Sequence, residues 1–144
     1  MIRTGALKVL VVDGDLEVCD QVRLILESRG HRVWTAYDGA RGLEAVLKCK
    51  PDLVILELHL RELSGYELLV RLKRDPRTVD IPVMVLTNLT KNDLRSDEDW
   101  RARTGAEAFL SKPIDLSTFL EGVEQAVAGH AKATPLDQEE TAKT

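Results

Sequence analysis

The sequence predicts an α/β fold of three layers, in which a doubly wound sheet of five parallel strands has helices on both faces. Five short apolar segments alternate with longer segments that carry apolar residues at helical spacing. One of the short segments, residues 53–56, is apolar throughout, which is typical of a parallel strand buried on both faces. Strands and helices that alternate in this way form parallel sheets through right-handed crossovers.

The predicted strands are apolar runs bounded by turn-forming residues. They cover residues 7–12, 32–36, 53–56, 83–86 and 108–111. A proline precedes the third strand at Pro51 and the fourth at Pro82. After the fourth strand, a polar loop over residues 88–97 leads into a short predicted helix over residues 98–103.

Capping residues and apolar spacing define the four longer helices. Asp15 and Asp115 are placed to cap the first and the last of them, and Gly30 can adopt the left-handed conformation that ends the first. The helix that begins at Gly65 ends before Asp75-Pro76, because proline disfavours helix in the preceding residue. The residues predicted to face the sheet are Val18, Val22, Ile25 and Leu26, then Leu43, Val46 and Leu47, then Leu68, Leu69 and Leu72, and finally Leu116, Phe119, Leu120, Val123 and Val127.

Length and composition indicate one domain over residues 1–130, followed by a flexible tail over residues 131–144. The net charge of −4 offers no basic field for nucleic acid. No apolar run is long enough to cross a membrane and no signal peptide is present, so a cytoplasmic protein without membrane partners is expected. Cys19 and Cys49 form no motif and are expected to be reduced thiols.

Four of the five predicted strands end in a polar side chain: Asp13, Glu57, Thr87 and Lys112. In an open parallel sheet the functional crevice lies outside the carboxyl ends of the strands. Asp13 and Glu57, with Asp15 close by, could hold a hard divalent cation such as Mg²⁺. Phosphoryl chemistry fits this set better than hydrolysis, since no nucleophile and base form a pair. A structural network of ion pairs is the alternative interpretation.

Five segments occur in an order that carries a family resemblance: residues 8–13 (KVLVVD), 51–57 (PDLVILE), 63–66 (LSGY), 85–87 (VLT) and 109–113 (FLSKP). Over residues 7–127 the chain resembles the response-regulator receiver domain of two-component signalling. The resemblance implies a flavodoxin-like sheet with strand order 2-1-3-4-5. It also implies a signalling role in a phosphorelay and no enzymatic activity.

The resemblance assigns roles to the strand-end residues. In that family the position of Glu57 is an aspartate that accepts a phosphoryl group from a histidine kinase, and an acidic pair after the first strand binds Mg²⁺. The positions of Thr87 and Lys112 contact the phosphoryl group. The aromatic position matched by Phe109 swings inward on activation, although a phenylalanine in a short strand is equally consistent with a core role. The bond between Lys112 and Pro113 is implied to be cis.

The sequence departs from the family at the acceptor and at the metal site. Glu57 replaces the aspartate, and Gly14 stands where the direct metal ligand belongs, which leaves Asp13 and an out-of-register Asp15. The longer glutamate side chain would reach the donors at the neighbouring strand ends and would be poorly placed for transfer. These departures predict a pseudo-receiver that is not phosphorylated at the usual position, with Asp13 and Glu57 as a weakened Mg²⁺ site.

The preferred hypothesis is therefore a module that acts through protein interactions. A histidine kinase or a downstream effector is the expected partner, and a homodimer could form through the fourth helix, the fifth strand and the fifth helix. The alternative is a conventional phosphoacceptor that uses Asp13 or Asp15. A DNA-binding output is not expected, because no second domain follows residue 127. Four basic residues could dock an acidic partner or form a solvated face: Arg71, Lys73, Arg74 and Arg77.

Overall fold

A computed structural model describes residues 5–88 and 104–133 of the chain. Its five strands form one sheet in the order β2-β1-β3-β4-β5, and all neighbouring pairs are parallel. The strands are β1 (Lys8–Val12), β2 (Arg32–Ala36), β3 (Leu53–Leu56), β4 (Val83–Thr87) and β5 (Ala108–Ser111). The predicted fold class and strand order are confirmed.

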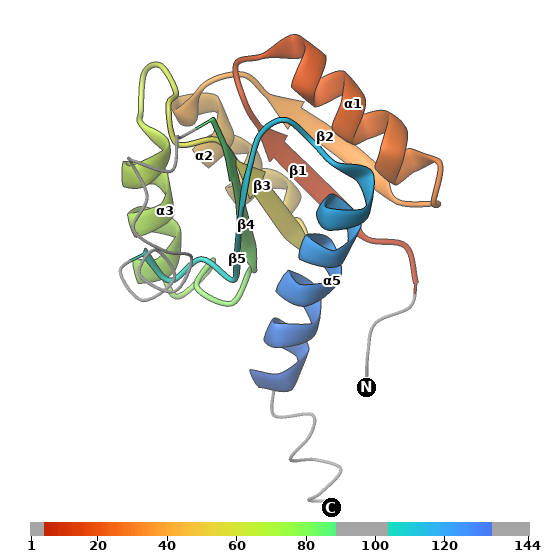
Figure 1. Ribbon diagram of the computed structural model, residues 1–144. Helices are drawn as coiled ribbons and strands as arrows, with labels where there is room; N and C mark the ends of the chain where they lie inside the picture. Colours follow the sequence, from red (N-terminus) through yellow and green to blue (C-terminus); the bar gives the residue numbers. More distant parts are fainter. Residues whose placement is uncertain (1–4, 89–103, 134–144) are drawn as a thin grey trace, which may run out of the picture.

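Four helices cover the sheet: α1 (Leu16–Glu27), α2 (Gly39–Cys49), α3 (Gly65–Arg74) and α5 (Leu116–Ala133). The first and last lie on one face, and α2 and α3 lie on the other (Figure 1). The predicted helix over residues 98–103 lies outside the described residues. Helix α5 continues to Ala133, past the predicted domain end at residue 130. In the described part of the chain, no helix has the length and apolar character needed to cross a membrane.

Each helix whose start was predicted from a capping residue begins as expected. Each of the four helices is preceded by a residue whose side chain caps it. This side chain accepts a hydrogen bond from a backbone N–H of the first turn, which has no partner within the helix. The pairs are Asp15 with Glu17, Asp38 with Arg41, Ser64 with Glu67, and Asp115 with Thr118. These local bonds fix where each helix leaves the carboxyl edge of the sheet.

Alternate strand residues point to opposite faces, so the sheet has a core on each side. Val9 and Val11 of β1 pack under α1 and α5, and Leu10 and Val12 pack under α2 and α3. Two residues predicted to face the sheet pack in neither core. Leu47 is half-buried and lines a groove at the surface, and Leu116 is 49% exposed. Leu116 is the first residue of α5, before the helix reaches the sheet, and burial begins one turn later.

Two glycines hold the loop that follows β3. The Gly39 N–H donates to the carbonyl of Arg61 at 3.1 Å, and the Gly65 N–H donates to the carbonyl of Leu58 at 2.9 Å. A Cβ atom at Gly39 would overlap the carbonyl oxygen of Leu63, and one at Gly65 would overlap that of Glu57. This close approach fixes the backbone at the end of β3.

The substitution Gly39→Ala is therefore expected to lower the free energy of unfolding by about 2–3 kcal/mol, because an added methyl group forces backbone apart in a packed region. Urea unfolding followed by circular dichroism measures this loss. Gly5→Ala is the matched control, since no atom lies within 4 Å of its Cβ position. Equal unfolding midpoints for the two variants would contradict the expectation.

Candidate functional site

The carboxyl edge of the sheet brings together the four side chains that the sequence placed at strand ends. Asp13 follows β1, Glu57 follows β3, Thr87 ends β4 and Lys112 follows β5. The exposed fractions of Asp13, Glu57 and Thr87 are 3%, 5% and 0%. The Lys112 side chain is 14% exposed. Such burial of charged groups requires that they satisfy one another.

Lys112 connects the two carboxylates. Its Nζ atom lies 2.9 Å from Oδ2 of Asp13 and 2.8 Å from Oε1 of Glu57. Burial disfavours the charged amine, but hydrogen bonds to Asp13 and Glu57 outweigh this effect and raise the pKa of Lys112 above its ordinary value. The ammonium group is thus retained between two carboxylates.

Both carboxylate oxygens of Glu57 have partners. While Oε1 binds Lys112, Oε2 accepts hydrogen bonds from the Thr87 hydroxyl at 2.5 Å and from the N–H groups of Leu58 at 2.7 Å and His59 at 3.1 Å. Burial alone would raise the pKa of Glu57, but the bonds from Lys112, Thr87 and His59 lower it below its ordinary value. Glu57 is therefore an ionised group with four donors.

Asp13 behaves differently from Glu57. Burial raises the pKa of Asp13, the nearby charge of Glu57 adds to this, and the bonds from Lys112 and from the Asp15 N–H do not fully compensate. The Asp15 N–H donates to Oδ1 of Asp13 at 2.9 Å. The two carboxylates that share Lys112 thus have pKa values displaced in opposite directions.

A magnesium ion at this site would have to compete with the protein's own donors for the carboxylates of Asp13 and Glu57. Each oxygen of Asp13 and Glu57 already accepts a hydrogen bond or an ion pair, and Gly14 supplies no carboxylate. The carboxylate of Asp15 caps α1 by accepting from the Glu17 N–H at 3.0 Å. Across the described residues, no group of three or more histidine, cysteine or acidic side chains is arranged to hold a metal ion.

A cleft of about 790 Å³ opens over Asp13, Glu57 and Lys112, whereas Thr87 is fully buried and does not line it. Tyr37, His59 and Arg61 line it together with the acidic residues and Lys112. Tyr37 and His59 were not predicted as site residues. The donor groups of Leu58 and His59 are backbone N–H groups, which every residue except proline carries, so no side-chain pattern identifies them.

Phe109 does not join this cluster. It is 3% exposed and lies in the core between the sheet and the α2–α3 layer. The peptide bond between Lys112 and Pro113 is cis, as the resemblance implied. The backbone N–H of Lys112 donates to the carbonyl of Thr87 at 2.8 Å, which continues the pairing of β4 with β5 to the site.

Cys19 lies directly beneath the site. Its thiol donates to the carbonyl of Asp13 at 3.4 Å. Burial, with the charges of Asp13, Asp20 and Asp15, raises the pKa of Cys19 to about 11. The thiol is thus protonated and unreactive at neutral pH, and both cysteines are free, as predicted.

Known proteins are similar to this chain over most of its length. The family model described as the response regulator receiver domain matches residues 9–124. Protein PilH of Pseudomonas aeruginosa is 31% identical over 122 residues, which cover 85% of this chain and 98% of that protein. The DNA-binding dual master transcriptional regulator RpaA of Synechocystis is 36% identical over 116 residues, or 81% of this chain. The chain spans 47% of the length of that regulator.

Solved structures show the same fold. A putative response regulator from Chloroflexus aurantiacus has a TM-score of 0.77 and 28% identity, and the match covers 85% of this chain and 98% of that one. A CheY-like receiver domain protein from Methanospirillum hungatei has a TM-score of 0.77 with 21% identity. At that identity the second likeness concerns the fold alone.

Proposed function

The chain belongs to the response-regulator receiver domain family, whose members are signalling domains of two-component systems, and we propose that it signals through protein contacts without a phosphoryl group at the end of β3. The observation that supports this is the bonding of Glu57. Its carboxylate engages Thr87 and Lys112, the two side chains that contact the phosphoryl group in the family. Glu57 thus takes up the donors that the modification would need.

The need for Mg²⁺ in phosphoryl transfer is a second argument against phosphorylation at the end of β3. Receiver domains typically bind Mg²⁺ at the phosphorylation site. In this chain a metal ion would have to displace Lys112 from Asp13 and Glu57, and the glycine at position 14 offers no replacement ligand. Charge neutralisation and orientation by a metal ion support phosphoryl transfer. We infer that Mg²⁺ binds this site weakly and that the protein carries no catalytic activity of its own.

The ionic network has a structural consequence for signalling. Lys112, held by two carboxylates, joins the ends of β1, β3 and β5. A buried network whose members are all hydrogen-bonded favours a single conformation of the residues at the carboxyl ends of these strands. We infer that the surface read by a histidine kinase or an effector is kept in a single state. Of the proposed dimer face, β5 and α5 belong to the described residues and the fourth helix does not.

A phosphorylation assay tests the proposal. After incubation with acetyl phosphate and Mg²⁺, the intact mass of the wild-type protein is expected to stay unchanged. A stoichiometric gain of one phosphoryl group would refute it. Borohydride trapping followed by tandem mass spectrometry would then show whether Asp13 or Asp15 is the acceptor, the alternative in which this is a conventional receiver.

A further inference from the structure

A groove of about 490 Å³ runs between α2 and α3 to the loop that precedes β4, away from the carboxyl edge of the sheet. Its apolar surface comes from the half-buried Leu43, Leu47 and Val70 and from the exposed Pro76. A volume of this size accommodates a few side chains of a bound segment. The groove shares no residue with the cleft over Glu57.

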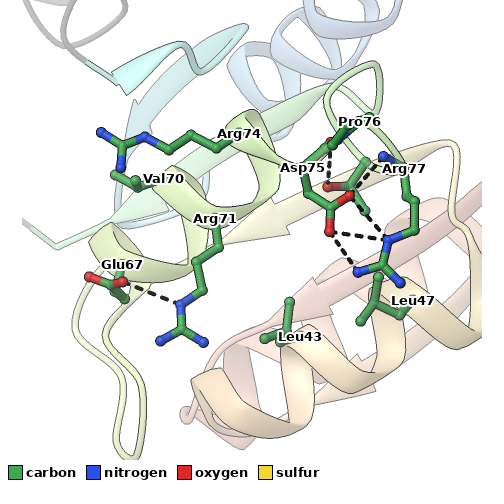
Figure 2. A pocket seen from close by; sticks show the side chains of 10 residues that line it. Leu43, Leu47, Glu67, Val70, Arg71, Arg74, Asp75, Pro76 and Arg77 are labelled. Carbon is green, nitrogen blue, oxygen red and sulfur yellow. Dashed lines mark hydrogen bonds and ion pairs between the residues drawn. The ribbon is translucent and has the colours of Figure 1, made fainter.

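Three arginines line the same groove: Arg71 and Arg74 on α3 and Arg77 in the following loop. Figure 2 shows the Arg71 and Arg77 guanidinium groups close to the leucines of α2, and Arg74 extending past Val70. Arg74 is exposed and forms no ion pair with the residues that the structure describes. The groove therefore combines aliphatic surface with cationic side chains.

The existing ion pairs leave these arginines available. Arg71 binds Glu67 through Nε at 3.2 Å, and both side chains are 52% exposed. Arg77 binds Asp75 through Nε and Nη2, the shortest distance being 2.7 Å, and the two side chains are 69% and 28% exposed; Nη1 of Arg77 makes no bond to Asp75. Exposed pairs of this kind contribute little to stability, and a guanidinium group has five N–H donors, so an arriving carboxylate can bind beside or replace the present one.

The charge of the groove is opposite to that of the whole chain. Its lining holds three arginines and two carboxylates, whereas the protein has a net charge of −4. An acidic partner is repelled by the molecule as a whole and attracted here, which favours this position. Nucleic acid is disfavoured, because its affinity depends on many phosphate contacts and the centre of this groove is aliphatic.

We propose that the groove binds an acidic segment of a partner protein, with leucine-like side chains on Leu43, Leu47 and Val70 and carboxylates on the arginines. This mode follows the common pattern in which an amphipathic segment lies in an apolar groove with charged edges. The inference is independent of the state of Glu57. Substituting Glu57 should leave the binding described here unchanged.

The test uses fluorescence anisotropy with the full chain and a fluorescein-labelled peptide in which two leucines at helical spacing are surrounded by glutamates. Replacing Arg71 and Arg74 together with glutamine is expected to weaken binding about five- to tenfold, from the loss of two exposed charge pairs. Leu47→Ala is expected to weaken it about threefold through lost apolar contact. Added salt should also weaken it.

The matched control replaces Arg29 and Arg41, two exposed arginines outside the groove lining, with glutamine. It changes the net charge equally and should leave the affinity unchanged. Equal loss in both double variants, or no loss in either, would overturn the proposal. Equally tight binding of a peptide with glutamines in place of glutamates would also overturn it.

Two other occupants give distinct results. If the groove binds a second copy of this chain, the sedimentation coefficient of the wild-type protein will rise with protein concentration. The variant with glutamine at positions 71 and 74 will then show no such rise. Tighter peptide binding after replacement of Glu139 and Glu140 with glutamine would assign it to the acidic C-terminal segment. Either result would overturn the proposed partner segment.

Discussion

Replacing Glu57 and Gly14 together with aspartate is expected to produce a protein that gains one phosphoryl group from acetyl phosphate in the presence of Mg²⁺. The shorter side chain at position 57 withdraws the carboxylate from Thr87 and Lys112 and leaves space for the incoming group. The aspartate at position 14 supplies a second metal ligand beside Asp13. Intact-mass spectrometry over a time course measures the result.

The two substitutions should not contribute equally. Glu57→Asp alone provides an acceptor but no new metal ligand, so we expect it to react at least about tenfold more slowly than the double variant, which corresponds to 1.4 kcal/mol. A side chain at position 14 requires only a small shift of the neighbouring backbone, because a Cβ atom there would lie 3.3 Å from the carbonyl oxygen of Tyr37 and close to no other atom. Wild type is expected to show no reaction.

The control for this experiment is Glu57→Asp combined with Gly14→Asn, which adds a side chain of nearly the same shape without the charge. It should react like Glu57→Asp alone. If the asparagine and aspartate variants react equally fast, the metal ligand is not the limiting feature. If the aspartate double variant stays unmodified, Glu57 is not what prevents transfer.

Replacing Lys112 with methionine is expected to lower the free energy of unfolding by about 3–5 kcal/mol, because it leaves two buried carboxylates without their cation. The relevant contacts are the 2.9 Å and 2.8 Å ion pairs with Asp13 and Glu57. Urea unfolding at pH 7 measures the loss. Lys48→Met is the control, since Lys48 is exposed on α2, and it should change stability by less than about 0.5 kcal/mol.

The pH dependence distinguishes this electrostatic cause from a loss of packing. The pKa of Glu57 is lowered in the folded wild-type protein, so its stabilising effect is present above the unfolded pKa, near 4.5, and is lost as the pH falls through the folded pKa. Without Lys112 the carboxylates hold protons at higher pH. The difference in stability between wild type and Lys112→Met should therefore shrink on acidification, and a constant difference would indicate packing instead.

Much of the fold could be predicted because local patterns and topology agree. The apolar run over residues 53–56 identified a central strand, and Asp15 and Asp115 identified helix starts. The grouping of Asp13 and Glu57 with two further strand-end residues followed from parallel strands alone, since their carboxyl ends share one edge. Position along a strand is thus sufficient to assemble this site.

Other features depend on contacts between distant segments. Leu116 fits the apolar spacing of α5, but spacing does not show where a helix first meets the sheet. The need for glycine at position 39 arises from the carbonyl of Leu63, which no local pattern connects to it. The pairing of Lys112 with both carboxylates depends on side-chain conformations that the sequence leaves open.

The position of Lys112 also bears on how the edge of the sheet opens. Strand β5 is an edge strand that pairs only with β4 among the described strands, and such strands commonly fray in native-state fluctuations. Lys112 directly follows β5, and its two ion pairs connect this strand to Asp13 and Glu57. These two residues directly follow β1 and β3, which are inner strands of the sheet. Amide hydrogen exchange of Phe109 and Leu110 should therefore follow the central strands in wild type and become faster and separate from them in Lys112→Met.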